Sequence, residues 1–208
     1  MVYGGFIVLR SVIVAILTVV SFPALAVNPC LNENFKPKLQ PPPPSNFLDV
    51  RRLHAMAELR SDNALKEIVE EADDPTPKFW AVAGTTPGSN PRLQKTISIV
   101  QPLTAAIVLD LKSKYARTRA NDVDPSLSTA IPVPWHKAYP SGHATQSFIT
   151  ALAFANVFPE KSDEFMRLAA KVAINREIAG LHYTSDSDAG AVLAEQIWKA
   201  VKPACKAK

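Results

Sequence analysis

The sequence has 208 residues, of which 47% are hydrophobic and 20% charged, a balance typical of a globular protein with an apolar core. Its formal net charge is +4, but no Lys/Arg run is dense enough to indicate nucleic-acid binding. The longest apolar run after the N-terminal region, residues 97–109, contains Gln101 and Pro102 and is shorter than the roughly 20 residues that a membrane-spanning helix needs.

Residues 1–26 have the layout of a secretory signal peptide. Arg10 is their one charged residue, an apolar run follows it, and the segment ends in the small-residue pattern of Ala24 and Ala26. An uncleaved membrane anchor is the alternative, which Pro23 and this ending disfavour. Cleavage would remove one positive charge and leave no stable membrane span, so we expect a periplasmic or secreted protein.

The two cysteines, Cys30 and Cys205, lie near the two ends of the chain that would remain. In an exported protein this placement favours one structural disulfide that ties the ends together, with two free thiols as the alternative. Closing so long a loop could add about 4 kcal/mol in the chain-entropy model.

Four successive prolines, Pro41 to Pro44, make residues 27–46 an extended arm, because proline donates no backbone hydrogen bond and fixes φ. Helical spacing of apolar residues covers residues 47–72, with Ser61 or Asp62 as an internal cap. Residues 73–91 indicate a turn-rich connection.

The second half of the chain indicates further helices. One helix should begin near Arg92, be disturbed at Pro102 and continue to about Arg119, and a proline-punctuated loop should occupy residues 121–140. Apolar periodicity then predicts three helices, over residues 142–157, 160–179 and 186–202. Since no β-type alternation or internal repeat is present, we predict one all-α domain, a helical bundle over residues 47–208.

The sequence Pro140-Ser141-Gly142-His143 precedes a helix directly. The first amides of that helix, near Gly142 and His143, have no intrahelical acceptor, and with the positive end of the helix dipole they can bind an anion. Ser141 adds a hydroxyl, and glycine lets a ligand approach the backbone closely. The alternative is an ordinary serine N-cap followed by a half-buried histidine.

A second group consists of Arg176, His182 and Asp186. If the chain is helical from His182, the carboxylate four residues later shares its face and can bond one ring nitrogen, which leaves the other as nucleophile or base. Gly180 indicates a break between two helices. The alternative is a surface salt bridge, which contributes little.

Lys112 and Arg119 are seven residues apart, which places them two helical turns apart on one face. A basic solvated face that includes Lys114 and Arg117 is the alternative. The order in which cations, histidines, a carboxylate and a helix N-terminus follow one another favours a common site.

These three groups resemble the motifs K-x6-R-P, P-S-G-H and S-R-x5-H-x3-D of the type 2 phosphatidic acid phosphatase superfamily. This superfamily includes bacterial class A nonspecific acid phosphatases, which the proline arm also resembles, and vanadium-dependent haloperoxidases. Two positions depart from the motifs: Ala120 stands for the proline after Arg119, and Asn175 for the serine before Arg176. We expect Ala120 to make the orientation of Arg119 less rigid.

The resemblance implies a metal-independent acid phosphatase without cofactors that acts on small phosphorylated substrates. His182 would be the nucleophile, oriented by Asp186, and His143 the general acid. The non-bridging phosphate oxygens would be held by Lys112, Arg119, Ser141, Gly142 and Arg176. Since His143 must start protonated and His182 neutral, we expect a bell-shaped pH profile with an acidic to near-neutral optimum.

Three other functions remain open: a vanadium-dependent haloperoxidase, whose usual members are longer, a lipid phosphatase, and a non-catalytic oxyanion-binding protein. Trp135, His136 and Lys137 are expected near the mouth of the site, and His54 at the surface. A homodimer is possible.

Overall fold

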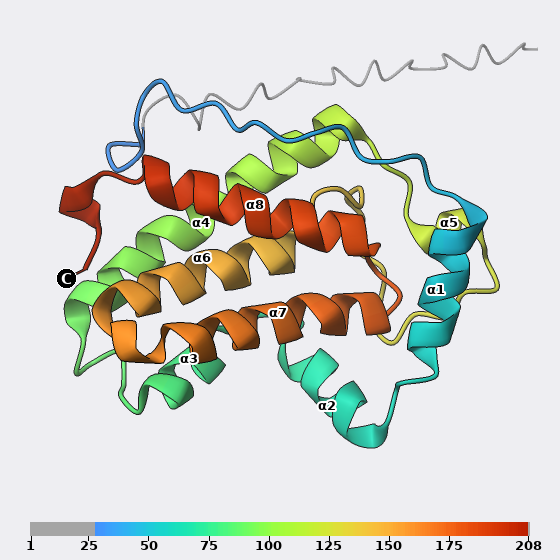
Figure 1. The fold of residues 1–208 in the computed structure, drawn as a ribbon, viewed down its shortest axis with the longest axis horizontal. Coiled ribbons are helices and arrows are strands. Elements are labelled where there is room, and N and C mark those ends of the chain that lie inside the picture. Colours follow the sequence, from blue (N-terminus) through green and yellow to red (C-terminus); the bar gives the residue numbers. More distant parts are fainter. Residues whose placement is uncertain (1–27, 208) are drawn as a thin grey trace, which may run out of the picture.

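The computed structural model describes residues 28–207, and its secondary structure there is helical apart from one isolated antiparallel bridge between Leu31 and Val201 (Figure 1). The all-α prediction is therefore confirmed for this part of the chain. The elements are α1 (Phe47–Ala57), α2 (Asp62–Glu70), α3 (Thr76–Ala83), α4 (Pro91–Tyr115), α5 (Ala120–Val123), α6 (Gly142–Val157), η2 (Pro159–Lys161), α7 (Ser162–Ile178), α8 (Thr184–Ala200) and η3 (Pro203–Cys205).

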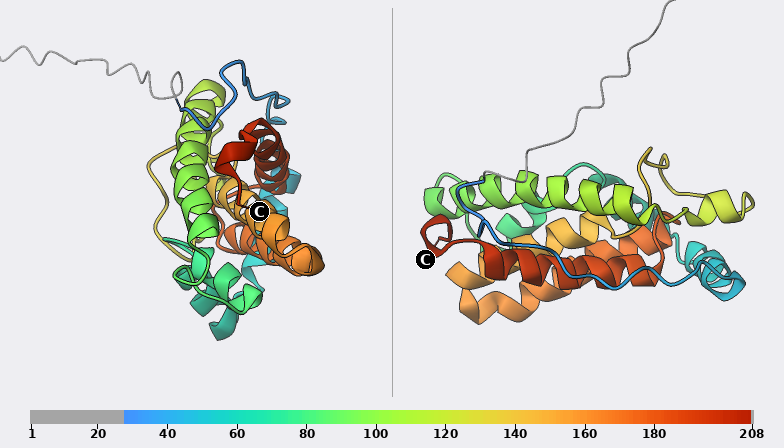
Figure 2. Two further views of the ribbon diagram at one scale, coloured as in Figure 1. Left: turned by 90° about the vertical axis from the view of Figure 1, so that its left-hand side faces the viewer. Right: turned by 90° about the horizontal axis from the view of Figure 1, so that it is seen from above.

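Helix α6 is the centre of the bundle. It packs against α4, α7 and α8, which surround it in both views of Figure 2. Residues on most sides of α6 are buried, which explains why its sequence is apolar with few polar positions. Its bounds agree with the predicted helix over residues 142–157.

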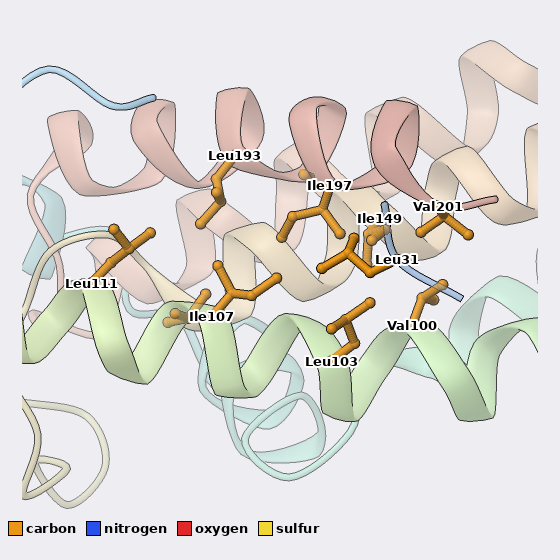
Figure 3. Close-up of a cluster of buried hydrophobic side chains, with 11 residues drawn as sticks. Leu31, Val100, Leu103, Ile107, Leu111, Ile149, Leu193, Ile197 and Val201 are labelled. Atoms are coloured by element: carbon orange, nitrogen blue, oxygen red, sulfur yellow. The ribbon is translucent and has the colours of Figure 1, made fainter. Parts of the chain in front are cut away.

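The main apolar core lies between α4, α6 and α8 (Figure 3). Val100, Leu103, Ile107 and Leu111 follow one another at helical spacing along α4 and face Leu193, Ile197 and Val201 from the C-terminal part of the chain. A second core is aromatic and is built around the three rings of Phe79, Phe154 and Phe165. Together these clusters fix the ends of α4, α6 and α8 relative to one another.

Several predicted boundaries need correction. Residues 73–91 are not only a connection, because α3 lies within them and buries Phe79 and Trp80. Helix α4 continues through Pro102 but ends at Tyr115 rather than near residue 119, since the next residue, Ala116, has the left-handed φ of 49°. Ser61, one of the two expected caps, accepts a hydrogen bond from the Ala64 amide and separates α2 from α1.

The predicted disulfide between Cys30 and Cys205 is present, and it joins the two ends of the described chain. Residues 28–46 form no helix and run alongside α8 in Figure 1. The hydroxyls of Tyr115 and Tyr139 donate to the Leu39 and Gln40 carbonyls at 2.9 and 2.7 Å, which fixes this segment beside the residues that follow α4. Across residues 28–207 no helix has the length and apolarity needed to cross a bilayer. The predicted signal peptide lies outside the described residues.

Candidate active site

The three motif groups meet around one pocket of about 790 Å³ between α4, the start of α6 and the loops around residues 130–136 and 181–182. Four of the predicted site residues line it: Lys112, Gly142, His143 and His182. The other four, Arg119, Ser141, Arg176 and Asp186, are fully or almost fully buried. Much of the remaining wall is apolar.

His182 Nδ1 lies 3.2 Å from Asp186 Oδ2, so the predicted pairing is present. Its local cause differs from the prediction, because α8 begins at Thr184 and the histidine precedes it. The Asp186 carboxylate points back across the first turn and also accepts the Tyr183 amide at 3.0 Å. Since Nδ1 donates to the carboxylate, Nε2 is the ring nitrogen left for chemistry.

Burial controls the charge of this pair. Burial lowers the pKa of His182 to about 3, although the hydrogen bond to Asp186 works in the opposite direction. For Asp186, burial alone would raise the pKa, but the His182 hydrogen bond and the nearby positive charges outweigh it and hold the pKa below its ordinary value. A neutral imidazole therefore faces an ionised carboxylate at neutral pH.

Arg117 is a site residue that the sequence interpretation missed. It is buried rather than part of a solvated basic face, and its Nη1 donates to Asp186 Oδ1 at 2.6 Å and to Ser185 Oγ at 2.7 Å. Its guanidinium also lies 4.1 Å from the centroid of the Tyr183 ring. The available signal was the R-x-R spacing: in the extended segment after α4, alternate residues point to one side, so Arg117 and Arg119 both point inward.

Lys112 and Arg119 converge, but not by sharing a helix face, because Arg119 lies beyond the end of α4. Lys112 Nζ donates to the carbonyls of Lys137 and Ala138 at 2.7 and 2.8 Å. Its pKa is lowered to about 7 by burial and by the Arg119 charge, with Asp186 opposing both.

Arg119 is held by backbone carbonyls. Its Nε donates to His136 O at 3.0 Å, and its Nη1 to Leu181 O at 2.6 Å. Ala120, which stands where the motif has proline, is the buried first residue of α5. Arg119 is thus bonded from the loops on both sides without a following proline.

The start of α6 is fixed against α8. Ser141 caps α6 by accepting the Ala144 amide at 3.3 Å, and its own amide donates to the Asp186 carbonyl at 2.9 Å. The amides of Gly142 and His143 follow in the first turn, where no intrahelical acceptor exists. A cis peptide bond joins Tyr139 to Pro140 just before this turn.

His143 is oriented by the segment after α2. Its Nε2 lies 2.9 Å from the Ala72 carbonyl, and because a carbonyl only accepts, Nε2 carries the proton and Nδ1 is free. Burial and the Arg176 charge lower the pKa of His143, against the effect of the Ala72 hydrogen bond. The protonated state expected from the sequence is therefore disfavoured.

Arg176 is fully buried at the end of α7. Its Nη2 donates to the Ile68 carbonyl at 2.8 Å and lies 3.5 Å from Glu71 Oε2, whereas Nε and Nη1 have no partner in the protein. Asn175, the second departure from the motif, donates to the same Glu71 oxygen at 2.9 Å. Glu71 was not singled out from the sequence.

A model of the PAP2 superfamily matches residues 17–204, which is most of the sequence. The chain belongs to the PAP2 superfamily. The motif resemblance is thereby confirmed.

Two curated relatives match this PAP2 protein over short segments. A non-specific acid phosphatase of Providencia stuartii is 33% identical over 57 residues, which cover 27% of this chain and 23% of the relative. A non-specific acid phosphatase of Salmonella typhi is 40% identical over 53 residues, which cover 26% of this chain and 21% of the relative. The matches thus span about a fifth to a quarter of the length of these relatives.

Two solved structures also match this PAP2 protein, each at 17% identity. A transmembrane PAP2 type phosphatidylglycerolphosphate phosphatase from Bacillus subtilis has a TM-score of 0.41, with 75% of this chain and 76% of that chain covered. A bacterial vanadium-dependent iodoperoxidase has a TM-score of 0.44, with 79% of this chain and 52% of that chain covered.

The remaining sequence candidates divide into two groups. Trp135 and His136 line the pocket of this PAP2 protein, whereas Lys137 contributes its carbonyl to Lys112. His54 is half-exposed and pairs with Asp124 at 3.0 Å, outside the pocket lining. Among residues 28–207 no group of three or more His, Cys, Asp or Glu side chains is placed to hold a metal ion.

Proposed function

We propose that this PAP2 protein is a metal-independent phosphatase that hydrolyses small phosphate monoesters through a phosphohistidine at His182. The observation that carries the proposal is the state of His182. Its Nδ1 is bonded to Asp186, burial keeps the ring neutral, and the ring lines a pocket beside Lys112. A neutral imidazole with one free nitrogen, surrounded by cations, is suited to attack an anionic phosphoryl group.

The first step would form the bond between His182 Nε2 and phosphorus and break the bond from phosphorus to the leaving oxygen. His143 would supply the proton for that oxygen from Nδ1, because its Nε2 donates to the Ala72 carbonyl. In the second step water would attack phosphorus, the nitrogen–phosphorus bond would break, and His143 would take up a proton from the water.

Positive charge and oriented donors would stabilise both steps. The non-bridging oxygens would be bound by Lys112, Arg119, Arg176, the Ser141 hydroxyl and the Gly142 amide. A bound dianion would raise the pKa of His143 and Lys112 and so favour the protonated forms that the reaction needs. The disulfide and the predicted leader support a periplasmic or secreted location.

The test is hydrolysis of p-nitrophenyl phosphate between pH 4 and 8 with EDTA present and vanadate as inhibitor. We expect turnover that survives EDTA and is blocked by vanadate. His182→Ala should abolish turnover and leave phosphate binding nearly intact, while His54→Ala, which removes a histidine paired with a carboxylate outside the pocket, should leave both unchanged.

Absence of turnover on any phosphoester would overturn the proposal. Peroxidation of bromide after addition of vanadate would then favour a haloperoxidase, and phosphate binding without either reaction would favour an oxyanion-binding protein. Light scattering on the same preparation tests for a homodimer.

A further inference from the structure

The C-terminal end of α2 contacts two residues of the candidate site at once. The Ile68 carbonyl accepts from Arg176 Nη2 at 2.8 Å, and the Ala72 carbonyl accepts from His143 Nε2 at 2.9 Å. Between them Glu71, whose side chain is completely buried, lies 3.5 Å from Arg176 Nη2. One short segment therefore touches both the expected phosphate-binding arginine and the expected general acid.

Three donors surround the buried Glu71 carboxylate. Lys78 Nζ is 2.7 Å from Oε1, and Asn175 Nδ2 is 2.9 Å from Oε2, on the oxygen that also faces Arg176. A buried carboxylate without such partners would cost several kcal/mol. Since Lys78 offsets the Glu71 charge from the other side, Arg176 can keep most of its positive field.

The contacts with Ile68 and Glu71 use only one nitrogen of the Arg176 guanidinium. Nη2 faces the end of α2, while Nε and Nη1 are buried and have no partner in the protein. Buried guanidinium donors without acceptors are costly, so these two nitrogens are suited to oxygen acceptors that arrive with a ligand. The departure at Asn175 fits the same arrangement, because its amide reaches Glu71 where a serine is shorter.

We propose that Glu71 is a positioning residue of this phosphatase, and the proposal rests on the function proposed above. It holds Nη2 of Arg176 so that the remaining N–H groups on Nε and Nη1 are free to donate to oxygens of a bound phosphoryl group. It also keeps the end of α2 against His143. The Lys78–Glu71–Asn175 cluster is thus the support of the site rather than a separate structural ion pair.

Glu71 also contributes to the charge balance at His143. The charges that act on His143 are Arg176 from α7 and Lys112 from α4, which disfavour its protonated form, and Glu71, which favours it. Asp73, His136 and His182 line the same pocket and are the other titratable groups near it. Removing the Glu71 charge leaves the cations less opposed, so His143 loses its proton at lower pH.

The experiment compares Glu71→Gln with the wild type and with Glu70→Gln. Glu70 is the matched control because it neighbours Glu71 in sequence and lies 3.8 Å from the same Lys78, yet it is half-exposed and does not contact Arg176. Titration calorimetry with inorganic phosphate gives a readout that needs no turnover. We expect phosphate to bind Glu71→Gln about tenfold more weakly, the scale of one charge-assisted hydrogen bond, and Glu70→Gln to bind it normally.

Kinetics supply the second readout. KM of Glu71→Gln should rise, and the alkaline limb of its pH profile should move to lower pH, whereas a structural role alone would reduce only the melting temperature. Glu71→Asp keeps the charge but is one methylene shorter, so it should restore the alkaline limb and recover phosphate binding only in part. If Glu71→Gln does not fold, the phosphate affinity of Glu71→Asp tests the proposal instead, because the shorter aspartate side chain loses the contact with Arg176.

Equal phosphate affinity in the wild type and in the folded Glu71 variants would overturn the positioning role. A wild type that binds phosphate but turns over no phosphoester would overturn the proposed function alone. The two failures are therefore distinguishable.

Discussion

Replacing Arg117 with methionine tests whether its buried charge beside Asp186 disfavours protonation of the coupled His182–Asp186 pair. Asp186 uses one carboxylate oxygen for His182 and the Tyr183 amide, and the other for Arg117 at 2.6 Å. Methionine keeps much of the arginine stem and its packing on the Tyr183 ring, but it removes the charge and the donors.

The cost of this change follows from the contacts. Removing one partner of a buried ion pair typically costs about 3–5 kcal/mol. Two other Arg117 nitrogens, Nε and Nη2, are buried without acceptors, and the substitution relieves their desolvation. We therefore expect a loss near the lower end of that range, about 3 kcal/mol, in the free energy of unfolding measured with urea.

The pH dependence carries the functional part of the prediction. Without the Arg117 charge, the coupled His182–Asp186 pair binds a proton more readily, because Arg117 holds the pKa of Asp186 down. The pKa of His182 is about 3 in the intact protein, so its acid limb lies below the assay range. In Arg117→Met the acid limb of kcat/KM should move up into that range.

The matched control is Lys114→Met, which removes an exposed positive charge from the last turn of α4. It should change neither the stability nor the acid limb. An Arg117→Met protein with wild-type stability and an unshifted acid limb would refute the argument that the Arg117 charge disfavours protonation of the coupled His182–Asp186 pair.

Three further changes test other parts of the site. A Cβ on Gly190 would lie 2.9 Å from the Ala144 Cβ, so Gly190→Ala should separate α8 from α6, cost roughly 1–3 kcal/mol in thermal melts and reduce kcat/KM. The control is Gly88→Ala, whose Cβ would meet the Thr86 hydroxyl at an ordinary 4.0 Å and should have none of these effects. Lys112, with its pKa near 7, should contribute its charge to phosphate binding only when protonated, so phosphate affinity measured by titration calorimetry should fall as the pH rises through about 7, and in Lys112→Arg this fall should move to higher pH. Trp135 is 90% exposed at the pocket, so Trp135→Ala should leave the melting temperature unchanged and lower kcat/KM for aryl phosphates more than for methyl phosphate.

Local patterns in the sequence predicted the all-α fold, but not the position of every helix. Helix α6 was predicted with its observed bounds because both of its signals are local, a serine cap and an unbroken apolar face. The prediction that Lys112 and Arg119 share a helix face was wrong, since it assumed that α4 continues. The left-handed conformation of Ala116 ends the helix there, and alanine gives no sequence signal for such a turn.

Arg117 and Glu71 could not be found in this way because their roles depend on distant parts of the chain. Arg117 is defined by Asp186, which is 69 residues away, and Glu71 by Asn175, which is 104 residues away. Each alone has the sequence context of an exposed charged residue, which is the commoner place for such side chains. Their burial follows only from how α2, α4, α7 and α8 pack.

The way the charges are held explains how the pocket can remain positive although two buried carboxylates lie beside it. Asp186 is offset by Arg117 and Glu71 by Lys78, and neither of these cations belongs to the expected phosphate-binding set. The binding cations are instead held largely by backbone carbonyls, which orient a donor without cancelling its charge. These contacts are Lys112 to Lys137 and Ala138, Arg119 to His136 and Leu181, and Arg176 to Ile68. Exchanging Lys78 for methionine should therefore weaken phosphate binding in titration calorimetry, because Glu71 would lose a 2.7 Å partner that holds its carboxylate against Arg176.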